Sequence, residues 1–483
     1  MLREGGNAID AAIVANAVMC VVYPHMTSIG GDLYALVWPA GAAEPIGLQG
    51  SGRSGEGATI AAMRERGFTT MPLRGATTVT VPGTVQAWGR LLERYGTVGM
   101  GRALGPAAAI AREGFVVGSN LSQQLHADHG WLSQDAEARR VLPPLLADMK
   151  LRQPELATTL EQIGRSGFGG FYFGELGRTI AEVVQRRGGF LTSADLAAHR
   201  GDWIEPLAMP YRGLTIYELP PPTQGLVAMA MLARLAGTPS GELVAGPALA
   251  RRLVGLRDVA YGLRSRYISD PDFVEVPAEP FLDPQFVAPP PADVLPDGDT
   301  IYLCTADEAG NVVSLIQSIA FDFGSGIVVE GTGILLQNRG CYFSLDPAHV
   351  NCLAPRKRTM HTLIPALAGR DGKPFAAFGN MAGEGQPQIQ VQVAMNLFDG
   401  GLDPAEAVAA PRVRVNPAGD TLWVEADYPG AAELNRAQSP RVELVPPRDQ
   451  RMGHAQALIV DSPTSWRAGA DPRADGSVQQ SMV

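Results

Sequence analysis

The chain has 483 residues, a net charge of −10, 46% hydrophobic residues and 18% charged residues. This apolar fraction supports a large core and excludes a disordered or coiled-coil chain. The acidic surplus argues against a general nucleic-acid binder. The length allows one large α/β domain or up to about three smaller ones.

Metal, cofactor and membrane signals are weak in this sequence. The four cysteines form no CxxC pair and the seven histidines form no HExxH motif, so we expect no metal and no cofactor. The apolar run Ala11–Tyr23 is shorter than the ~20 residues that a spanning helix needs. Without a signal-peptide pattern after Met1, we expect a cytoplasmic protein with no membrane partner. A periplasmic location is the alternative if the true start lies upstream.

The first part of the chain is predicted to be mainly helical. Residues 7–22 follow Gly5-Gly6 and are apolar on almost all sides, as in a buried helix, and residues 33–37 form a buried strand. The other elements expected here are a short strand at 77–81, helices within 84–150 and 153–200, two strands within 203–222, and helices within 224–268.

The second part is predicted to be rich in strands. Residues 274–299 form a proline-rich surface segment without a core pattern, which ends at Asp299. Residues 300–305 and 312–319 then form a β-hairpin. Further strands are expected at 327–329, 334–336, 363–367, 375–378, 422–424, 442–444 and 457–460, with helices at 386–398 and 404–410. This distribution indicates a layered α/β architecture around one core.

The junction between Asp299 and Thr300 is the most informative point in the chain. A proline-rich stretch ends there at a threonine that begins a buried hairpin. If the peptide bond before Thr300 were cut, the new α-amino group, with a pKa near ~8, would be a base for the threonine hydroxyl. A plain linker followed by a strand is the alternative interpretation of the same pattern.

Three further segments have the chemistry of a binding site. The small residues of Gly379–Gly385, between a strand and a helix, suit backbone N–H groups that form an oxyanion hole. A phosphate loop is disfavoured because GxxxxGK[ST] is absent, and a plain turn remains open. Arg339 lies in a glycine-bounded turn and suits bidentate capture of a carboxylate, or an ordinary ion pair. His361 follows a basic run and also fits a satisfied loop histidine.

A set of short motifs extends along nearly the whole chain. They are Gly5-Gly6-Asn7-Ala8-Ile9-Asp10-Ala11-Ala12, Val81-Pro82-Gly83-Thr84, Thr300-x-Tyr302 with Asp307 and Gly310-Asn311, Phe323-Gly324-Ser325-Gly326, Gly331-Thr332-Gly333-Ile334-Leu335-Leu336, Pro355-x-Lys357-Arg358, Ala410-Pro411-Arg412 and Gly469-Ala470-Asp471-Pro472-Arg473. These motifs resemble, in the same order, those of the gamma-glutamyltransferase family of N-terminal-nucleophile hydrolases.

The resemblance implies a four-layer αββα sandwich made as one precursor that cleaves itself. Residues 1–299 would become the large chain and residues 300–483 the small chain, which together form one domain. Thr300 would be the nucleophile, and its freed amine would be the base. Ser318 would support it, and Ala382 and Gly383 would provide the oxyanion hole. The cleavage site is then Asp299-Thr300.

The sequence departs from the family at the substrate-binding positions. Where the family has an Asn, an acidic residue and a Ser pair that grip a glutamyl group, this chain has Ala320, Tyr342 and His361-Thr362. The carboxylate that would hold an α-ammonium is therefore absent, and a buried ammonium without a partner is costly. Arg53 loosely matches the family's carboxylate-binding arginine, and Arg339 is an addition.

Several pieces look most like the branch that contains oxamate amidohydrolase, among them Gln337-Asn338-Arg339-Gly340 and His361-Thr362-Leu363-Ile364-Pro365. We therefore predict an autoprocessing threonine amidohydrolase that acts on a small anionic amide. The alternatives are a gamma-glutamyltransferase or glutathione hydrolase, a cephalosporin-acylase-like enzyme, and a non-catalytic family member. The expected partner is a small-molecule amide, with no nucleic acid, and a dimer of two-chain units remains open.

Overall fold

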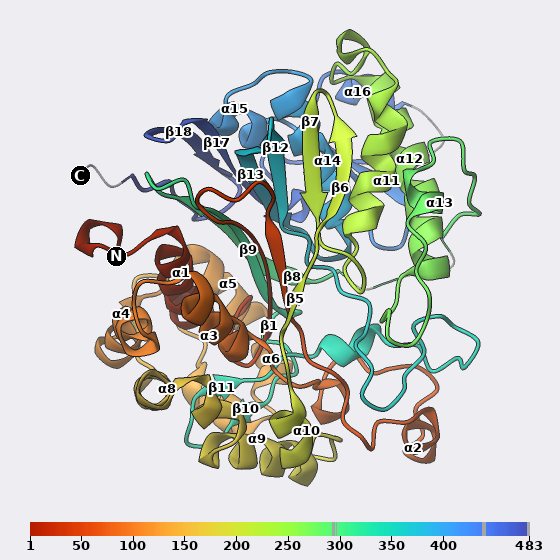
Figure 1. The fold of residues 1–483 in the computed structure, drawn as a ribbon. Helices are drawn as coiled ribbons and strands as arrows, with labels where there is room; N and C mark the ends of the chain where they lie inside the picture. The colour runs from red at the N-terminus through yellow and green to blue at the C-terminus, as the bar shows by residue number, and fades with distance from the viewer. Residues whose placement is uncertain (292–294, 296, 437–440, 481–483) are drawn as a thin grey trace.

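The computed structural model describes residues 1–291, 295, 297–436 and 441–480. Two β-sheets lie face to face and helices cover the outer face of each, which makes four layers (Figure 1). Five helices between residues 8 and 186 cover the first sheet, and four helices between residues 225 and 409 cover the second (Figure 1). This is the αββα arrangement that the sequence predicts.

The first sheet has five antiparallel strands in the order β5-β2-β1-β9-β8. Its edge strand β8 begins at the predicted nucleophile and its neighbour β9 completes the predicted hairpin. The strands are β5 (Asp202–Ile204), β2 (Ile46–Gly50), β1 (Asp32–Trp38), β9 (Val312–Ala320) and β8 (Asp299–Ala306).

The second sheet has six antiparallel strands in the order β18-β17-β13-β12-β7-β6. The strands are β18 (Ser465–Ala470), β17 (His454–Ser462), β13 (Lys373–Met381), β12 (Ala366–Arg370), β7 (Leu214–Glu218) and β6 (Leu207–Tyr211). Because β13 lies in the middle, its end brings the loop of residues 382–385 close to the start of β8 at the sheet interface.

Strand β1 shows how its sequence builds both sides of the first sheet. All seven of its residues are buried, and successive side chains point to opposite faces. Leu33, Ala35 and Val37 therefore pack into the cluster under the outer helices. Tyr34, Leu36 and Trp38 pack between the two sheets, where Trp38 meets Tyr217 of β7 edge to face at 5.5 Å.

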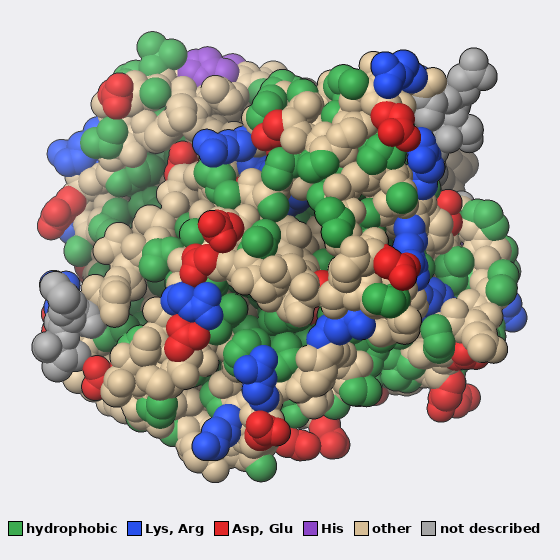
Figure 2. Space-filling view, turned by 90° about the horizontal axis from the view of Figure 1, so that it is seen from above, with side chains coloured by type: hydrophobic (Ala, Val, Ile, Leu, Met, Phe, Trp, Pro, Cys, Tyr) green, Lys and Arg blue, Asp and Glu red, His purple; other side chains and the backbone are tan. Residues whose placement is uncertain are grey.

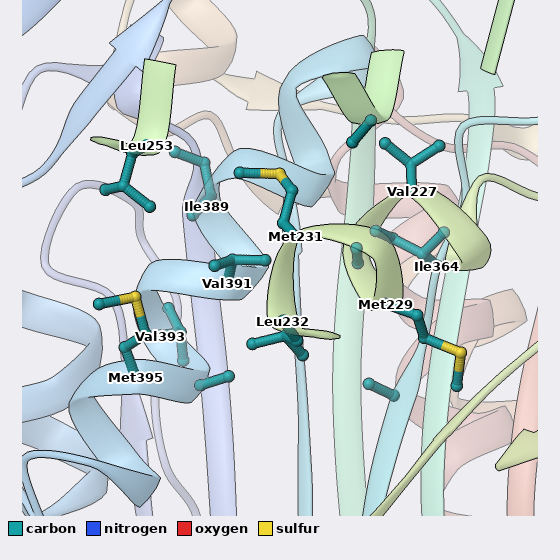
Figure 3. Packing of buried hydrophobic residues seen from close by; sticks show 14 of the residues in the cluster. Val227, Met229, Met231, Leu232, Leu253, Ile364, Ile389, Val391, Val393 and Met395 are labelled. Carbon is teal, nitrogen blue, oxygen red and sulfur yellow. The ribbon is translucent and has the colours of Figure 1, made fainter. Parts of the chain in front are cut away.

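The outer helices complete the core on both sides. Under the second sheet, side chains of α11, α12 and α14 interdigitate, with Met231, Leu253, Ile389 and Val391 among the buried residues (Figure 3). The helices that cover the first sheet are α1 (Ala8–Val22), α3 (Thr84–Tyr95), α4 (Met100–Glu113), α8 (Pro154–Tyr172) and α9 (Glu175–Arg186). Those on the second are α11 (Gly225–Ala236), α12 (Pro247–Tyr267), α14 (Gln386–Phe398) and α15 (Pro404–Ala409).

The remaining elements are short and lie around this sandwich. The helices are α2 (Ile60–Glu65), α5 (Ser119–Ala127), α6 (His129–Leu132), α7 (Ala136–Val141), α10 (Ser193–Ala198), α13 (Glu279–Leu282) and α16 (Ala431–Asn435). The strands are β3 (Phe115–Val116), β4 (Lys150–Leu151), β10 (Val328–Val329), β11 (Ile334–Leu335), β14 (Val413–Val415), β15 (Thr421–Glu425) and β16 (Arg441–Val445).

Four local predictions are wrong, and three of them concern residues 77–81, 363–367 and 274–299. Residues 77–81 form no strand, because Gly75 turns the chain at φ 97° and Thr78 Oγ1 donates to the Gly75 carbonyl, which closes a 3₁₀ turn over Ala76–Thr78. The strand expected at 363–367 begins at Ala366, after Pro365, which has no N–H to donate. The proline-rich segment 274–299 does contact the core, because Phe281 is fully buried; residues 292–294 and 296 lie outside the described part.

Helix α1 is buried on one face only, in contrast to the prediction. A capping box of Asn7 and Asp10 begins it. Ile9, Ile13 and Ala17 are buried on the sheet side, whereas Ala15 is exposed.

Across the surface seen in Figure 2, acidic and basic side chains are interspersed. No helix within the described ranges is long and apolar enough to cross a membrane.

Candidate active site

Thr300 lies at the start of β8, where the ladder with β9 is irregular. Asp299 pairs with Ala320 and Ile301 with Gln317, so two residues of β9, Ser318 and Ile319, lie opposite Thr300 alone. Such a bulge re-aims side chains and is common beside active sites. Ala320 has φ 81°, a conformation that is strained for any residue other than glycine. The bulge thus directs two hydroxyl groups to the same peptide bond.

Both hydroxyls contact the carbonyl oxygen of Asp299. The Thr300 hydroxyl donates to it at 2.6 Å, and the Ser318 hydroxyl donates to it at 2.6 Å. The Ala320 N–H donates to Ser318 Oγ at 2.7 Å, which orients that hydroxyl toward the carbonyl. Thr300 and Ser318 are almost fully buried. The structure therefore brings together the predicted nucleophile, its predicted support and the predicted scissile bond.

Ala382 and Gly383 lie between the end of β13 and the start of α14. Within the described chain, neither of their N–H groups donates a recorded hydrogen bond, so both remain available. Gly383 has φ 51°, and a Cβ there would overlap the backbone nitrogen of Gly298. The loop thus lies directly against the segment before Thr300, which is the place an oxyanion hole requires.

Arg339 is the cation of the site. It lies in a 3₁₀ turn over Arg339–Tyr342 and is 1% exposed. Its Nη1 donates to Thr362 Oγ1 at 3.1 Å, and its guanidinium carbon lies 5.3 Å from the centre of the Tyr342 ring. Arg339 Nε and Nη2 and the Tyr342 hydroxyl are buried with no recorded hydrogen-bond partner in the described part of the chain. Because most buried polar groups are hydrogen-bonded, this cluster is a candidate position for binding an acceptor group.

His361 and Asp32 lie against this cluster. The His361 Nε2 is 3.3 Å from Asp32 Oδ2. Burial lowers the pKa of His361 well below its usual value, with Arg339 acting in the same direction. Burial raises the pKa of Asp32 to about 7, against the opposing effect of Arg339. Asp32 pairs in register with Ser318, so the cluster lies beside the β9 bulge.

Two glutamines complete the site, and sequence reasoning assigned no role to either. Gln224 Nε2 donates to the carbonyl of Thr362 at 3.1 Å and to that of Gly383 at 3.4 Å, so it ties the Arg339 cluster to the loop. Gln386 Nε2 lies 3.5 Å from Thr300 Oγ1. Gln386 could have been noticed because it directly follows the glycine-rich turn; Gln224 shows no such signal.

Arg53 has other contacts. It forms ion pairs with Asp270, at 2.9 Å, and with Asp272, and it donates to the Arg356 carbonyl. These partners occupy its guanidinium, so the contacts of Arg53 do not include the other predicted substrate-binding residues.

Two carboxyl groups beside the cleavage site have raised pKa values. Burial raises the pKa of Asp299 to about 6, and the pKa of Asp322, its hydrogen-bonded neighbour, rises well above its usual range.

A large groove of about 1130 Å³ runs along the free edge of β8, and Thr300 is part of its wall. Its lining includes Val18 and Met19 of α1, Met26, and Trp466 of β18. Arg339, Tyr342, His361 and Thr362 are not part of this lining. The groove therefore reaches Thr300 without these residues, whereas the Arg339 cluster lies beside the segment before Thr300, since a Cβ at Gly298 would lie 3.0 Å from the Tyr342 hydroxyl oxygen. In the ranges that the structure describes, no group of three His, Cys, Asp or Glu side chains could hold a metal ion.

Comparisons with known proteins identify the family. The Gamma-glutamyltranspeptidase family model matches residues 1–481. A glutathione hydrolase-like YwrD proenzyme from Bacillus subtilis is 36% identical over 499 aligned residues, covering 99% of this chain and 94% of the relative. An oxamate amidohydrolase proenzyme from Klebsiella pneumoniae is 34% identical over 513, with the same shares covered.

The structures agree with this result. A cephalosporin acylase from Bacillus halodurans superposes with a TM-score of 0.91 at 35% identity, covering 99% of this chain and 92% of that one. Helicobacter pylori gamma-glutamyltranspeptidase gives a TM-score of 0.55 at 28% identity, over 59% of this chain and 84% of that one. These findings confirm the predicted family and fold class. The chain is an enzyme of the gamma-glutamyltranspeptidase family, with the N-terminal-nucleophile hydrolase fold.

Proposed function

We propose that this chain cleaves itself between Asp299 and Thr300 and then hydrolyses small anionic amides through an acyl-enzyme on Thr300. The observation that carries the proposal is the double contact on the Asp299 carbonyl, which accepts hydrogen bonds from the hydroxyls of both Thr300 and Ser318. These contacts support the proposal, because the Thr300 hydroxyl lies beside the carbonyl that it would attack and the Ser318 hydroxyl would polarise that carbonyl.

The self-cleavage proceeds in two steps. Thr300 Oγ attacks the carbonyl carbon of Asp299 and its proton passes to the departing backbone nitrogen, which converts the amide into an ester. Water then hydrolyses the ester, which leaves a carboxylate on Asp299 and a free α-amine on Thr300. That amine is the base for later turnover. In turnover, the N–H groups of Ala382 and Gly383 bind the oxyanion, with Gln386 beside the nucleophile.

The Arg339 cluster supports an anionic substrate. Among the described residues, Nε and Nη2 of Arg339 and the hydroxyl of Tyr342 have no hydrogen-bond partner, and a carboxylate fits them. The carboxylate of Asp32 already accepts from Gly52 N–H and Gln337, so it is poorly suited to hold a substrate ammonium. The relative named oxamate amidohydrolase agrees with this chemistry, whereas a glutamyl substrate needs both a cation and an anion in the pocket.

A second candidate is an acylase that acts on bulky amides. The large groove along β8 supports it, because it reaches Thr300 and is wide enough for an apolar acyl or leaving group. The likeness to a cephalosporin acylase points the same way. This candidate shares the nucleophile and the oxyanion loop with the first and differs only in which side of Thr300 holds the substrate.

Two measurements test the proposal. The intact mass of the purified protein should correspond to chains of residues 1–299 and 300–483; an active enzyme that stays in one piece would refute the mechanism. Initial rates should then be compared for oxamate, a gamma-glutamyl anilide, glutathione and a long-chain N-acyl anilide. We expect the highest kcat/KM for oxamate or another small anionic amide. A preference for the glutamyl compounds would identify a gamma-glutamyltransferase or glutathione hydrolase, and a preference for the long acyl chain would identify an acylase.

A further inference from the structure

Arg414, on the short strand β14, has a contact pattern that the proposed reaction does not use. Its side chain is 2% exposed. Nη1 donates to the Arg451 carbonyl at 2.6 Å, and Nη2 donates to the Ala382 carbonyl at 3.1 Å. Nη2 also forms an ion pair with Asp297 Oδ1 at 2.6 Å. Arg414 thus connects the oxyanion loop to a residue three positions before Thr300.

Asp297 is the group that balances the positive charge of Arg414. The two carbonyls orient the guanidinium but do not neutralise it. Glu384, the other acid that acts on Arg414, already pairs with Arg264 at 3.3 Å. Asp297 is therefore the one described carboxylate in an ion pair with Arg414. A buried cation whose partner is removed is strongly destabilised, so this position calls for an anion.

Asp297 belongs to the segment that fills the pocket in the continuous chain. A Cβ at Gly383 would overlap the backbone of Gly298 and approach the Asp297 carboxylate to 2.7 Å. A Cβ at Gly298 would overlap the Ala320 carbonyl oxygen and lie 3.0 Å from the Tyr342 hydroxyl. Residues 297–299 thus occupy the space beside the oxyanion loop where the acyl group of a substrate has to lie.

We propose that Arg414 is a second specificity-determining residue, which binds Asp297 in the uncut chain and a substrate carboxylate after the cut. The Asp297 carboxylate marks the place that this group takes. The inference rests on the proposed function and extends it, because the single carboxylate of a small amide, such as the monoamide of a dicarboxylic acid, would then be bound by Arg414 as well as by Arg339, while the amide carbonyl lies at the oxyanion loop. The uncut chain blocks the same place with its own acid.

The test is binding of matched inhibitors to the cleaved enzyme by calorimetry, with oxalate, malonate and succinate each compared with its monomethyl ester. We expect at least one diacid to bind tenfold more tightly than its ester. Arg414→Gln should abolish that ratio and Arg414→Lys should keep part of it. Arg451→Gln is the matched control, since this substitution removes a nearby positive charge from an exposed side chain outside the pocket. This variant should keep the full ratio.

Two results would overturn the inference. The first is that the ratio of diacid to ester affinity persists in Arg414→Gln and only kcat falls, which would show that Arg414 merely holds the Ala382 loop. The second is that Asp297→Asn tightens diacid binding to the cleaved enzyme, which would show that Asp297 stays on Arg414 after the cut. Failure of the proposed function has a different signature, because the wild-type protein would then remain uncut or would not hydrolyse amides, whatever the inhibitors do.

Discussion

The two sides of Thr300 differ in chemistry. On one side lie buried polar groups whose hydrogen-bonding capacity is not used by the part of the chain that the structure describes, namely Arg339, Tyr342 and the N–H groups of Ala382 and Gly383. On the other side runs the groove along β8, which has a volume of about 1130 Å³ and is lined in large part by apolar side chains such as Val18 and Met19. Size alone would assign the substrate to the groove. The proposed function places the substrate on the polar side, because catalysis needs groups that bind developing charge.

The largest expected effect comes from the residue that both sides share. Thr300→Ala should leave one uncut chain and reduce amide hydrolysis by more than ~10⁴-fold, since no other group described here replaces the nucleophile. Thr300→Ser, which keeps a hydroxyl, should still be cut and retain measurable turnover. Intact mass and initial rates test both variants. Turnover of either class of substrate by Thr300→Ala would show that Thr300 is not the nucleophile shared by the two sides.

Loss of the supporting hydroxyl should have the next largest effect. Ser318→Ala removes the donor to the Asp299 carbonyl and should slow both self-cleavage and turnover by ~10–1,000-fold, where the upper part of this range is the loss found for one oxyanion donor. Ser318→Thr keeps the hydroxyl and is the control. The rate of cleavage can be followed by gel after synthesis in a cell-free system. Unchanged rates would make Ser318 an ordinary strand residue.

Arg339 tests the polar side directly. Arg339→Ala should lower kcat/KM for an anionic amide by an amount equivalent to about 1.5–3 kcal/mol, the scale of a hydrogen bond to a charged group, mainly through KM. Its effect on an uncharged amide should be much smaller, and Arg339→Lys should recover part of the loss. Equal losses for charged and uncharged amides would show that Arg339 supports the fold and not the substrate.

The smallest effect is expected on the groove side. Trp466→Ala removes a large, half-buried side chain from the wall of the groove and so widens the groove. It should change KM for a small anionic amide by less than about twofold, because surface substitutions away from a site are usually near neutral. Steady-state kinetics with small and long-chain amides measures the difference. A tenfold change for the long-chain amide would move the substrate to the groove and favour the acylase.

The sequence predicts the family, the layers and the hairpin well, because β8 and β9 have clear strand patterns and a short turn between them. It also places Thr300 and Ser318 correctly at neighbouring ends of that hairpin. It could not predict the contacts of Arg53, because Asp270 lies 217 positions away in the sequence. Gln224 and Arg414 were missed for the same reason: ordinary polar residues acquire a role only through tertiary contacts.

The strand order has a consequence for the lifetime of the enzyme. Both sheets combine strands from before and after residue 299: β1 pairs with β9 in one, and β7 with β12 in the other. A cut at this bond leaves two interleaved polypeptides. Before the cut, an unfolded molecule can refold alone; afterwards, two separate chains must find each other, at a rate that depends on concentration. The cut enzyme would then be protected by slow unfolding and not by a reversible equilibrium, and heating should inactivate it irreversibly, whereas the uncut Thr300→Ala chain should recover on cooling.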